Sequence, residues 1–261
     1  MHTQPWNVTA PGDKTRLLVM DRQEPFPVSF ALLATTATDK VAIRIAGGCK
    51  GMELEDKAAM MEYFEQAFAG YAGMVWSGGT RQADGDGNLD PMVTDLPGHI
   101  ARSNGGCIAL GSTPRTSYLR LVEESRLVLD DWGTGLNPDM SAILIVQNRA
   151  DGELDWDGDL DQAFGLMGNL QRDAGFKVGW IGWNGGGVTE KELVQSAKRG
   201  WPTVLIRGSQ RACDELIAKL EAGDEELLAQ VGERHGFLIA DRSDPATLRQ
   251  HLIEQGFLIE A

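Results

Sequence analysis

Short runs of apolar, mostly β-branched residues alternate along this chain with longer stretches in which apolar residues recur every three or four positions. The short runs predict strands that are buried on both faces of a sheet. They span residues 16–20, 28–34, 41–46, 74–77, 107–110, 142–147, 178–182, 203–207 and 237–240. The longer stretches predict amphipathic helices over residues 53–70, 160–174, 189–199, 210–222 and 244–255. This alternation predicts an α/β fold in three layers, with helices on both faces of a parallel sheet.

The length of 261 residues suits one large α/β domain or two small ones. Neither an internal repeat nor a low-complexity linker divides the chain, so we expect a single domain over residues 1–261. The first 35 residues are expected to extend the sheet with antiparallel strands rather than to form a separate domain.

The charge balance narrows the choice of partners. The chain has 38 acidic and 24 basic residues, a net charge of −14, which argues against binding to nucleic acid or to an anionic membrane. Its apolar runs are far shorter than the ~20 residues of a membrane-spanning helix, and its N-terminus lacks the pattern of a signal peptide. Three cysteines without a C-x-x-C pair fit a reducing compartment. We therefore expect a cytoplasmic protein whose partner is a small molecule.

Glycine is the outlier of the composition, with 32 of 261 residues. The glycines gather directly after predicted strands, together with hydroxyl, amide and arginine side chains. A single glycine pair would be explained by a tight turn, but the carboxyl ends of parallel strands meet at one edge, where helix N-termini expose N–H groups. The sequence therefore predicts an anion-binding rim there. Its candidate ligand-binding residues are Gly47, Gly48, Ser77, Gly78, Gly79, Thr80, Asn184, Gly185, Gly186, Gly208, Ser209 and Arg211. Trp183, beside this rim, is a candidate for stacking on a base.

No resident metal is expected. The acidic run over residues 151–161 is similar to a calcium loop, but Phe164 stands where a bidentate glutamate is required. The run over residues 84–90 has Leu89 where such a loop needs glycine, and the four histidines lack metal-ligand spacing. A divalent ion that accompanies a phosphate ligand stays open.

The order of the glycine motifs resembles the SLOG superfamily of Rossmann-like nucleotide-binding domains. The closest likeness is to the LSDAT group, which occurs at the cytoplasmic N-terminus of TRPM-type channels and as stand-alone bacterial proteins. The matching motifs are Gly47-Gly48, Ser77-Gly78-Gly79, Gly185-Gly186 and the segment from Gly208 to Asp214, in which Gln210 replaces a third glycine.

This resemblance covers residues 41–217. Residues 1–35 would then be an N-terminal strand extension, and residues 218–261 the C-terminal helices and last strand. The resemblance implies a Rossmann-like fold and a sensor or binding module for ADP-ribose or another NAD-derived ligand, with no cofactor required.

Residues 184–192 also resemble the Pro-Gly-Gly-x-Gly-Thr-x-x-Glu motif of the lysine-decarboxylase-like phosphoribohydrolases. They match at both early glycines, Thr189 and Glu192, and depart at Asn184 and Val188. This resemblance implies an alternative, an enzyme that hydrolyses a nucleoside monophosphate with Glu192 as the catalytic carboxylate. A glutamate early in a helix is also favoured by the helix dipole alone. A second alternative is a DprA-like nucleic-acid-processing protein, which the net charge disfavours. Turnover and oligomeric state, a homo-oligomer included, stay open.

Overall fold

The structure is a computed structural model, which describes residues 5–7, 16–21, 37–83, 89–114, 123, 137, 139–147, 156–232 and 236–260. Its strands are β1 (Pro5–Asn7), β2 (Arg16–Asp21), β3 (Val41–Gly48), β4 (Met74–Gly78), β5 (Ile108–Pro114), β6 (Ala142–Gln147), β7 (Lys177–Asn184), β8 (Thr203–Arg207) and β9 (Phe237–Asp241). Its helices are α2 (Leu54–Ala67), the 3-10 turn η1 (Val93–Asp95), α3 (Leu96–Ser103), α5 (Trp156–Ala174), α6 (Gly187–Lys198), α7 (Arg211–Glu221), α8 (Glu225–Val231) and α9 (Pro245–Glu254).

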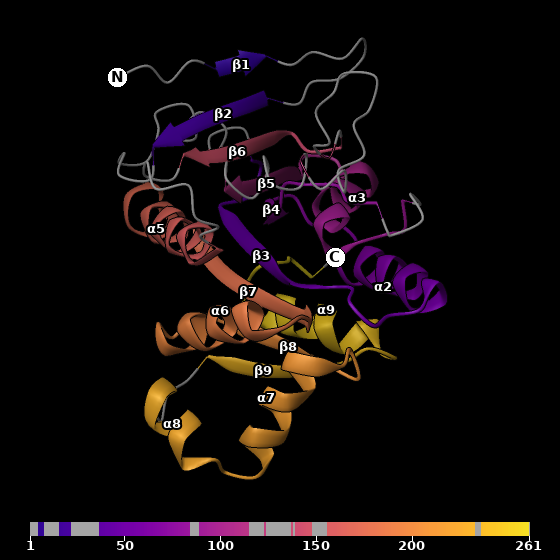
Figure 1. The fold of residues 1–261 in the computed structure, drawn as a ribbon, viewed down its shortest axis with the longest axis vertical. Coiled ribbons are helices and arrows are strands. Elements are labelled where there is room, and N and C mark those ends of the chain that lie inside the picture. Colours follow the sequence, from indigo (N-terminus) through magenta and orange to yellow (C-terminus); the bar gives the residue numbers. More distant parts are fainter. Residues whose placement is uncertain are drawn as a thin grey trace.

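The described strands form one nine-stranded sheet in the order β1-β2-β6-β5-β4-β3-β7-β8-β9 (Figure 1). Every pairing is parallel except that of β1 with β2. The antiparallel expectation for the first 35 residues is therefore wrong for β2, in which Arg16 pairs with Ala142 of the parallel β6. The continuous apolar run in β2 is typical of an interior parallel strand. The strand expected over residues 28–34 lies outside the described residues.

Helices cover both faces of the sheet, which confirms the three-layer α/β fold. Side chains alternate along each strand, so β3 sends Ala42 and Ala46 to one face and Ile43 and Ile45 to the other. The first face packs against α5, α6, α7 and α8. The second face packs against α2, α3 and α9. Among the described residues, none of the helices has the length and apolar character needed to cross a membrane.

The direction of the chain reverses at the centre of the sheet. From β3 the chain proceeds through β4, β5 and β6 toward one edge, and then returns to β7, beside β3, and builds β8 and β9 toward the other. The two strands pair along their full length, with Gly48 opposite Asn184 at their carboxyl ends. In open α/β sheets, ligands bind outside the carboxyl ends of the strands at such a switch point.

Candidate functional site

A cavity of about 280 Å³ opens beside the switch point, at the carboxyl ends of β3, β4 and β5. Two elements complete it: the first turns of α6 and the segment that contains η1. Hydroxyl side chains make up much of its polar lining, contributed by Ser77, Thr80, Thr94, Ser112, Thr113 and Thr189. Of the sequence-predicted site residues, those that line the cavity are Gly47, Gly48, Ser77, Gly78, Thr80 and Glu192.

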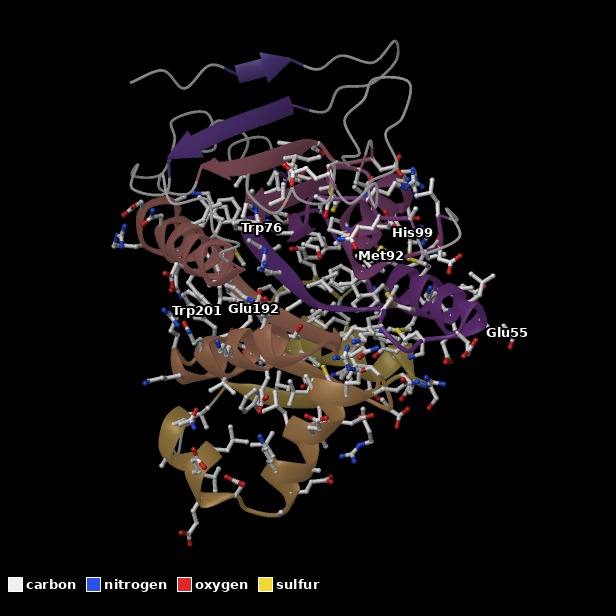
Figure 2. The ribbon with its side chains drawn as sticks, viewed as in Figure 1. Glu55, Trp76, Met92, His99, Glu192 and Trp201 are labelled. Atoms are coloured by element: carbon white, nitrogen blue, oxygen red, sulfur yellow. The ribbon has the colours of Figure 1, made fainter. Side chains whose placement is uncertain are left out.

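A buried ion pair forms the floor of this cavity. Arg44 on β3 donates from Nε to Oε1 of Glu192 on α6, and each residue is 5% exposed. Trp180 donates from Nε1 to the same oxygen over 2.8 Å. The other carboxylate oxygen accepts no hydrogen bond from the residues that the structure describes. Trp76 and Glu192, both labelled in Figure 2, contact the same side chain: the Arg44 guanidinium, paired with Glu192, lies 5.2 Å from the centre of the Trp76 ring.

Arg44 was not singled out by the sequence analysis. A signal for it exists, because it is an isolated charge within an otherwise apolar strand over residues 41–46. A charge that is buried in this way needs a partner, and that partner is Glu192, 148 residues away in the chain. The pair makes the floor polar but electrically neutral.

The N-terminus of α6 opens onto the cavity. Gly186 is the N-cap, and no side chain in the described part of the chain caps the helix. The first hydrogen bond of the helix is donated by the Glu190 N–H to the Gly186 carbonyl. The N–H groups before Glu190 in the first turn therefore have no acceptor within the helix. Val188 and Thr189 of that turn line the cavity. The positive end of the helix dipole therefore faces a space in which an anion could be bound.

The glycines of the rim have different structural roles. A Cβ at Gly47 would lie 2.0 Å from the Trp183 carbonyl oxygen, so this glycine allows β3 and β7 to pair closely. A Cβ at Gly78 would lie 2.7 Å from Cγ2 of Thr94, and one at Gly79 would lie 2.8 Å from Cγ2 of Ile143. Gly48 alone of these four leaves open space, because a Cβ there would meet no atom within 4 Å.

The second group of predicted residues, at the ends of β7 and β8, lies outside the cavity lining. The Ser209 hydroxyl accepts the Asn184 N–H over 2.9 Å and donates to the Ile206 carbonyl over 2.6 Å. The Asp214 carboxylate accepts the N–H groups of Gly208 and Gln210, over 2.7 and 2.9 Å. These contacts hold the turn between β8 and α7 and use N–H groups that the sequence analysis assigned to a ligand. Gly185, with φ of +89°, packs against Thr189.

Arg211 is exposed at the edge of the site. Its Nη2 lies 3.0 Å from the position of a Cβ at Gly186, so the guanidinium lies beside the N-terminus of α6. An ion pair with Asp214, on its own helix, is not formed, because the Asp214 carboxylate caps the turn instead. The structure thus places Arg211 next to the cavity without making it part of the lining.

Two further sequence expectations concern stacking and metals. Trp183 is 2% exposed and packs in the core against Tyr63 and Phe64, with ring centres 5.5 and 5.6 Å apart, so it is not placed to stack on a ligand base. Within the described residues, no group of three or more histidine, cysteine, aspartate or glutamate residues could hold a metal ion. Of the two acidic runs, residues 84–88 and 151–155 lie outside the described residues, and residues 156–161 belong to α5.

The three thiols of the chain are expected to be unreactive in the native protein. Burial raises the pKa of Cys49 and brings the pKa of Cys107 and of Cys213 to about 12. At pH 8 a thiol of pKa 12 is about one part in ten thousand thiolate, the reactive form. Ellman's reagent should therefore titrate three thiols in urea and react slowly before urea is added. Rapid reaction of any one thiol in the native protein would contradict this assignment.

Comparison with known proteins finds a likeness to solved structures only. The chain matches none of the known family descriptions, and no curated protein matches it. Among solved structures, it is similar to the structural genomics target TM1055, with a TM-score of 0.48 and 17% identity over 82% of this chain and 99% of that one. It is also similar to the molybdenum cofactor carrier protein MCP from Chlamydomonas reinhardtii, with a TM-score of 0.46 and 14% identity over 83% of this chain and 98% of that one. The chain is an α/β protein with a Rossmann-like fold.

Proposed function

We propose that this protein binds a nucleotide-derived small molecule, ADP-ribose or another NAD-derived ligand, in the cavity beside the switch point. The observation that carries the proposal is the N-terminus of α6, which lacks a side-chain cap and opens onto that cavity. A phosphate is the anion that such a helix terminus typically binds. The resemblance of the glycine motifs to the SLOG superfamily, and to its LSDAT group, supports the same class of ligand.

The arrangement of the lining suggests how the ligand is oriented. A phosphate would be held by the N–H groups of Val188 and Thr189, with Gly48 leaving room for its approach. The ribose hydroxyls would then face the serine and threonine side chains and the Glu192 oxygen that no described residue holds. The cavity volume of about 280 Å³ is close to the lower end of the ~300–1,000 Å³ of ligand pockets. It therefore suits one nucleotide-sized unit, and a longer ligand would extend toward Arg211.

The proposal is tested by calorimetric titration with ADP-ribose, NAD, AMP and inorganic phosphate, followed by chromatography of the mixture. We expect saturable binding of ADP-ribose or NAD, with the ligand recovered intact. No resident cofactor is required; a divalent ion would arrive with the phosphate, so each titration is run with and without Mg²⁺. Absence of binding by all four compounds in both conditions would overturn the proposal.

Val188→Asp should abolish most of this binding without harming the fold. Val188 is 41% exposed at the cavity, so a carboxylate there needs no buried space. At an effective dielectric constant of ~20, two charges ~6 Å apart repel by about 3 kcal/mol, which corresponds to about a hundredfold loss of affinity. An aspartate in the first helical turn is favourable for the helix itself, so thermal stability should not fall.

Val188→Asn is the matched control, because asparagine has nearly the shape of aspartate without its charge. Calorimetry should show that it binds ADP-ribose within a few-fold of the wild type. Equal loss of affinity in both variants would show that the shape of Val188 matters and that no anion lies at the N-terminus of α6.

A second candidate function is hydrolysis of a nucleoside monophosphate. The observation that favours it is the position of Glu192 in the cavity lining, with one carboxylate oxygen held by two donors and the other not held by described residues. A carboxylate fixed in this way can activate a water molecule against an N-glycosidic bond. Release of free base from AMP, lost in a Glu192→Gln variant that is still folded by circular dichroism, would favour the enzyme; recovery of intact AMP would favour the binding module.

A further inference from the structure

One wall of the cavity is the segment Met92–Val93–Thr94, which leads into η1; the start of α6 contributes other lining residues. Its contact with the sheet is close, because Cγ2 of Thr94 occupies the space that a Cβ would take at Gly78. Thr94 contacts the end of β4 and the turn after it, where Ser77, Gly78 and Thr80 also line the cavity. The shape of the cavity therefore depends on how the wall is held against this turn.

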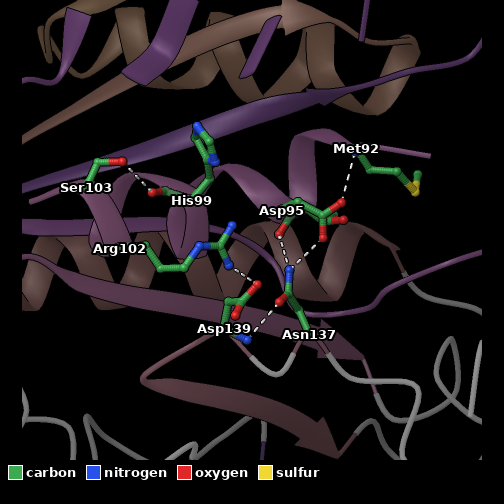
Figure 3. Close-up of polar contacts among 8 residues, drawn as sticks. Met92, Asp95, His99, Arg102, Ser103, Asn137 and Asp139 are labelled. Atoms are coloured by element: carbon green, nitrogen blue, oxygen red, sulfur yellow. Dashed lines mark hydrogen bonds and ion pairs between the residues drawn. The ribbon is translucent and has the colours of Figure 1, made fainter. Parts of the chain in front are cut away.

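Asn137 holds the two together, although it does not line the cavity itself. Its backbone N–H donates to the Gly79 carbonyl over 3.3 Å, within the turn after β4. Its side-chain Nδ2 donates to the Thr94 carbonyl over 3.3 Å and to Oδ1 of Asp95 over 2.7 Å, within the wall. Figure 3 shows Asn137 between Asp95 and Asp139. Asn137 is only 1% exposed.

Each remaining polar atom of Asn137 is also used. Its Oδ1 accepts the Asp139 N–H over 3.0 Å, and its backbone carbonyl accepts the Met140 N–H over 3.3 Å. Asp95 extends the connection, because its other oxygen accepts the Met92 N–H over 3.0 Å. A fully bonded buried amide fixes the geometry of its neighbours, since losing any one bond leaves a buried polar group unpaired.

We infer that Asn137 is a positioning residue for the ligand site, which acts by holding the wall at Met92–Thr94 against the turn after β4. The inference rests on the proposed function for its effect on affinity, and on the hydrogen bonds alone for its effect on the wall. If Asn137 had a purely structural role, its substitution would lower stability but would affect the cavity no more than substitution of another buried asparagine.

The chain offers a matched control in Asn104, at the other end of α3. Asn104 is also a buried asparagine, 6% exposed, and it also joins two segments. Its Oδ1 accepts the Gly70 N–H over 2.7 Å, and its Nδ2 donates to the Ile100 carbonyl over 2.9 Å. Neither it nor its partners line the cavity.

The experiment compares Asn137→Ala with Asn104→Ala by calorimetry with ADP-ribose and by amide hydrogen exchange. We expect Asn137→Ala to weaken ADP-ribose binding about tenfold and to accelerate exchange in the peptides that contain Gly79 and Met92–Asp95. Asn104→Ala should leave both measurements at those sites unchanged, whatever its loss of stability. Asn137→Ser also loses the donors to Thr94 and Asp95 but keeps a polar side chain without adding a charge, so it should behave like Asn137→Ala and replaces it if the alanine variant does not fold.

Two outcomes would overturn the inference: unchanged exchange in both peptides of the Asn137 variants, or the same loss of affinity in Asn104→Ala. Absence of ADP-ribose binding by the wild type would instead count against the proposed function. In that case the exchange measurement still decides whether Asn137 holds the wall.

Discussion

Glu192→Gln should lower the free energy of unfolding by about 3–5 kcal/mol, because it removes the carboxylate that forms the buried ion pair with Arg44. Both side chains are 6% exposed, so water entering from the cavity replaces only part of the lost interaction. Glutamine has nearly the shape of glutamate and keeps an oxygen for the Trp180 N–H, which Glu192 accepts over 2.8 Å. The loss therefore reports the missing charge rather than a cavity or a lost indole contact. Urea unfolding of the two proteins measures it.

The double variant Arg44→Met, Glu192→Gln is the control for this interpretation. Replacing both members of a buried ion pair is often neutral, because the cost of removing two charges from water is avoided. We expect the double variant to recover stability to within about 1 kcal/mol of the wild type. A double variant as unstable as Glu192→Gln would show that Glu192 stabilises the fold through contacts other than its pair with Arg44.

The sequence predicted the parts of the site that depend on local patterns. Buried parallel strands are continuous apolar runs, so eight described strands, all except β1, were located from residue type alone. Because the ends of parallel strands share one edge, the glycine motifs could be assigned to that edge before the structure was known. Glu192 could be placed early in a helix because the helical pattern begins at residue 189, and the structure places it on α6.

The remaining parts depend on contacts between distant segments, which local patterns do not contain. Arg44 and Glu192 meet across 148 residues, and Asn137 meets Asp95 across 42. Two of the described helices, α3 and α8, were not predicted. The first turn of α3 contains Pro97 and Gly98, and α8 has only seven residues, so neither carries a long apolar stripe. At the start of α7, the N–H groups of Gly208 and Gln210 donate to Asp214 of that same helix, a contact that the sequence pattern did not indicate.

Gly47 and Gly48 are adjacent in the sequence, but only the fold shows that they have different neighbours. They give the second prediction with a large effect. Gly47→Ala should destabilise the fold severely, since its Cβ would lie 2.0 Å from the carbonyl oxygen of Trp183 on the paired strand. Overpacking typically costs ~1–3 kcal/mol and more where backbone must move, and here β3 and β7 must separate. We therefore expect Gly47→Ala to lose at least ~3 kcal/mol in urea unfolding or to be recovered only as unfolded protein.

Gly48→Ala should behave in the opposite way, although it is the next residue on β3. Its Cβ would meet no atom within 4 Å, and its φ lies outside the left-handed region, so stability should stay within about 0.5 kcal/mol of the wild type. The added methyl group would lie at the cavity, where it obstructs the approach of a phosphate to the N-terminus of α6. Calorimetry with ADP-ribose should then show about a tenfold loss of affinity. A folded Gly48→Ala that binds as tightly as the wild type would place the phosphate away from the end of β3, whereas a stable Gly47→Ala would show that the β3–β7 pairing tolerates a side chain at its carboxyl end.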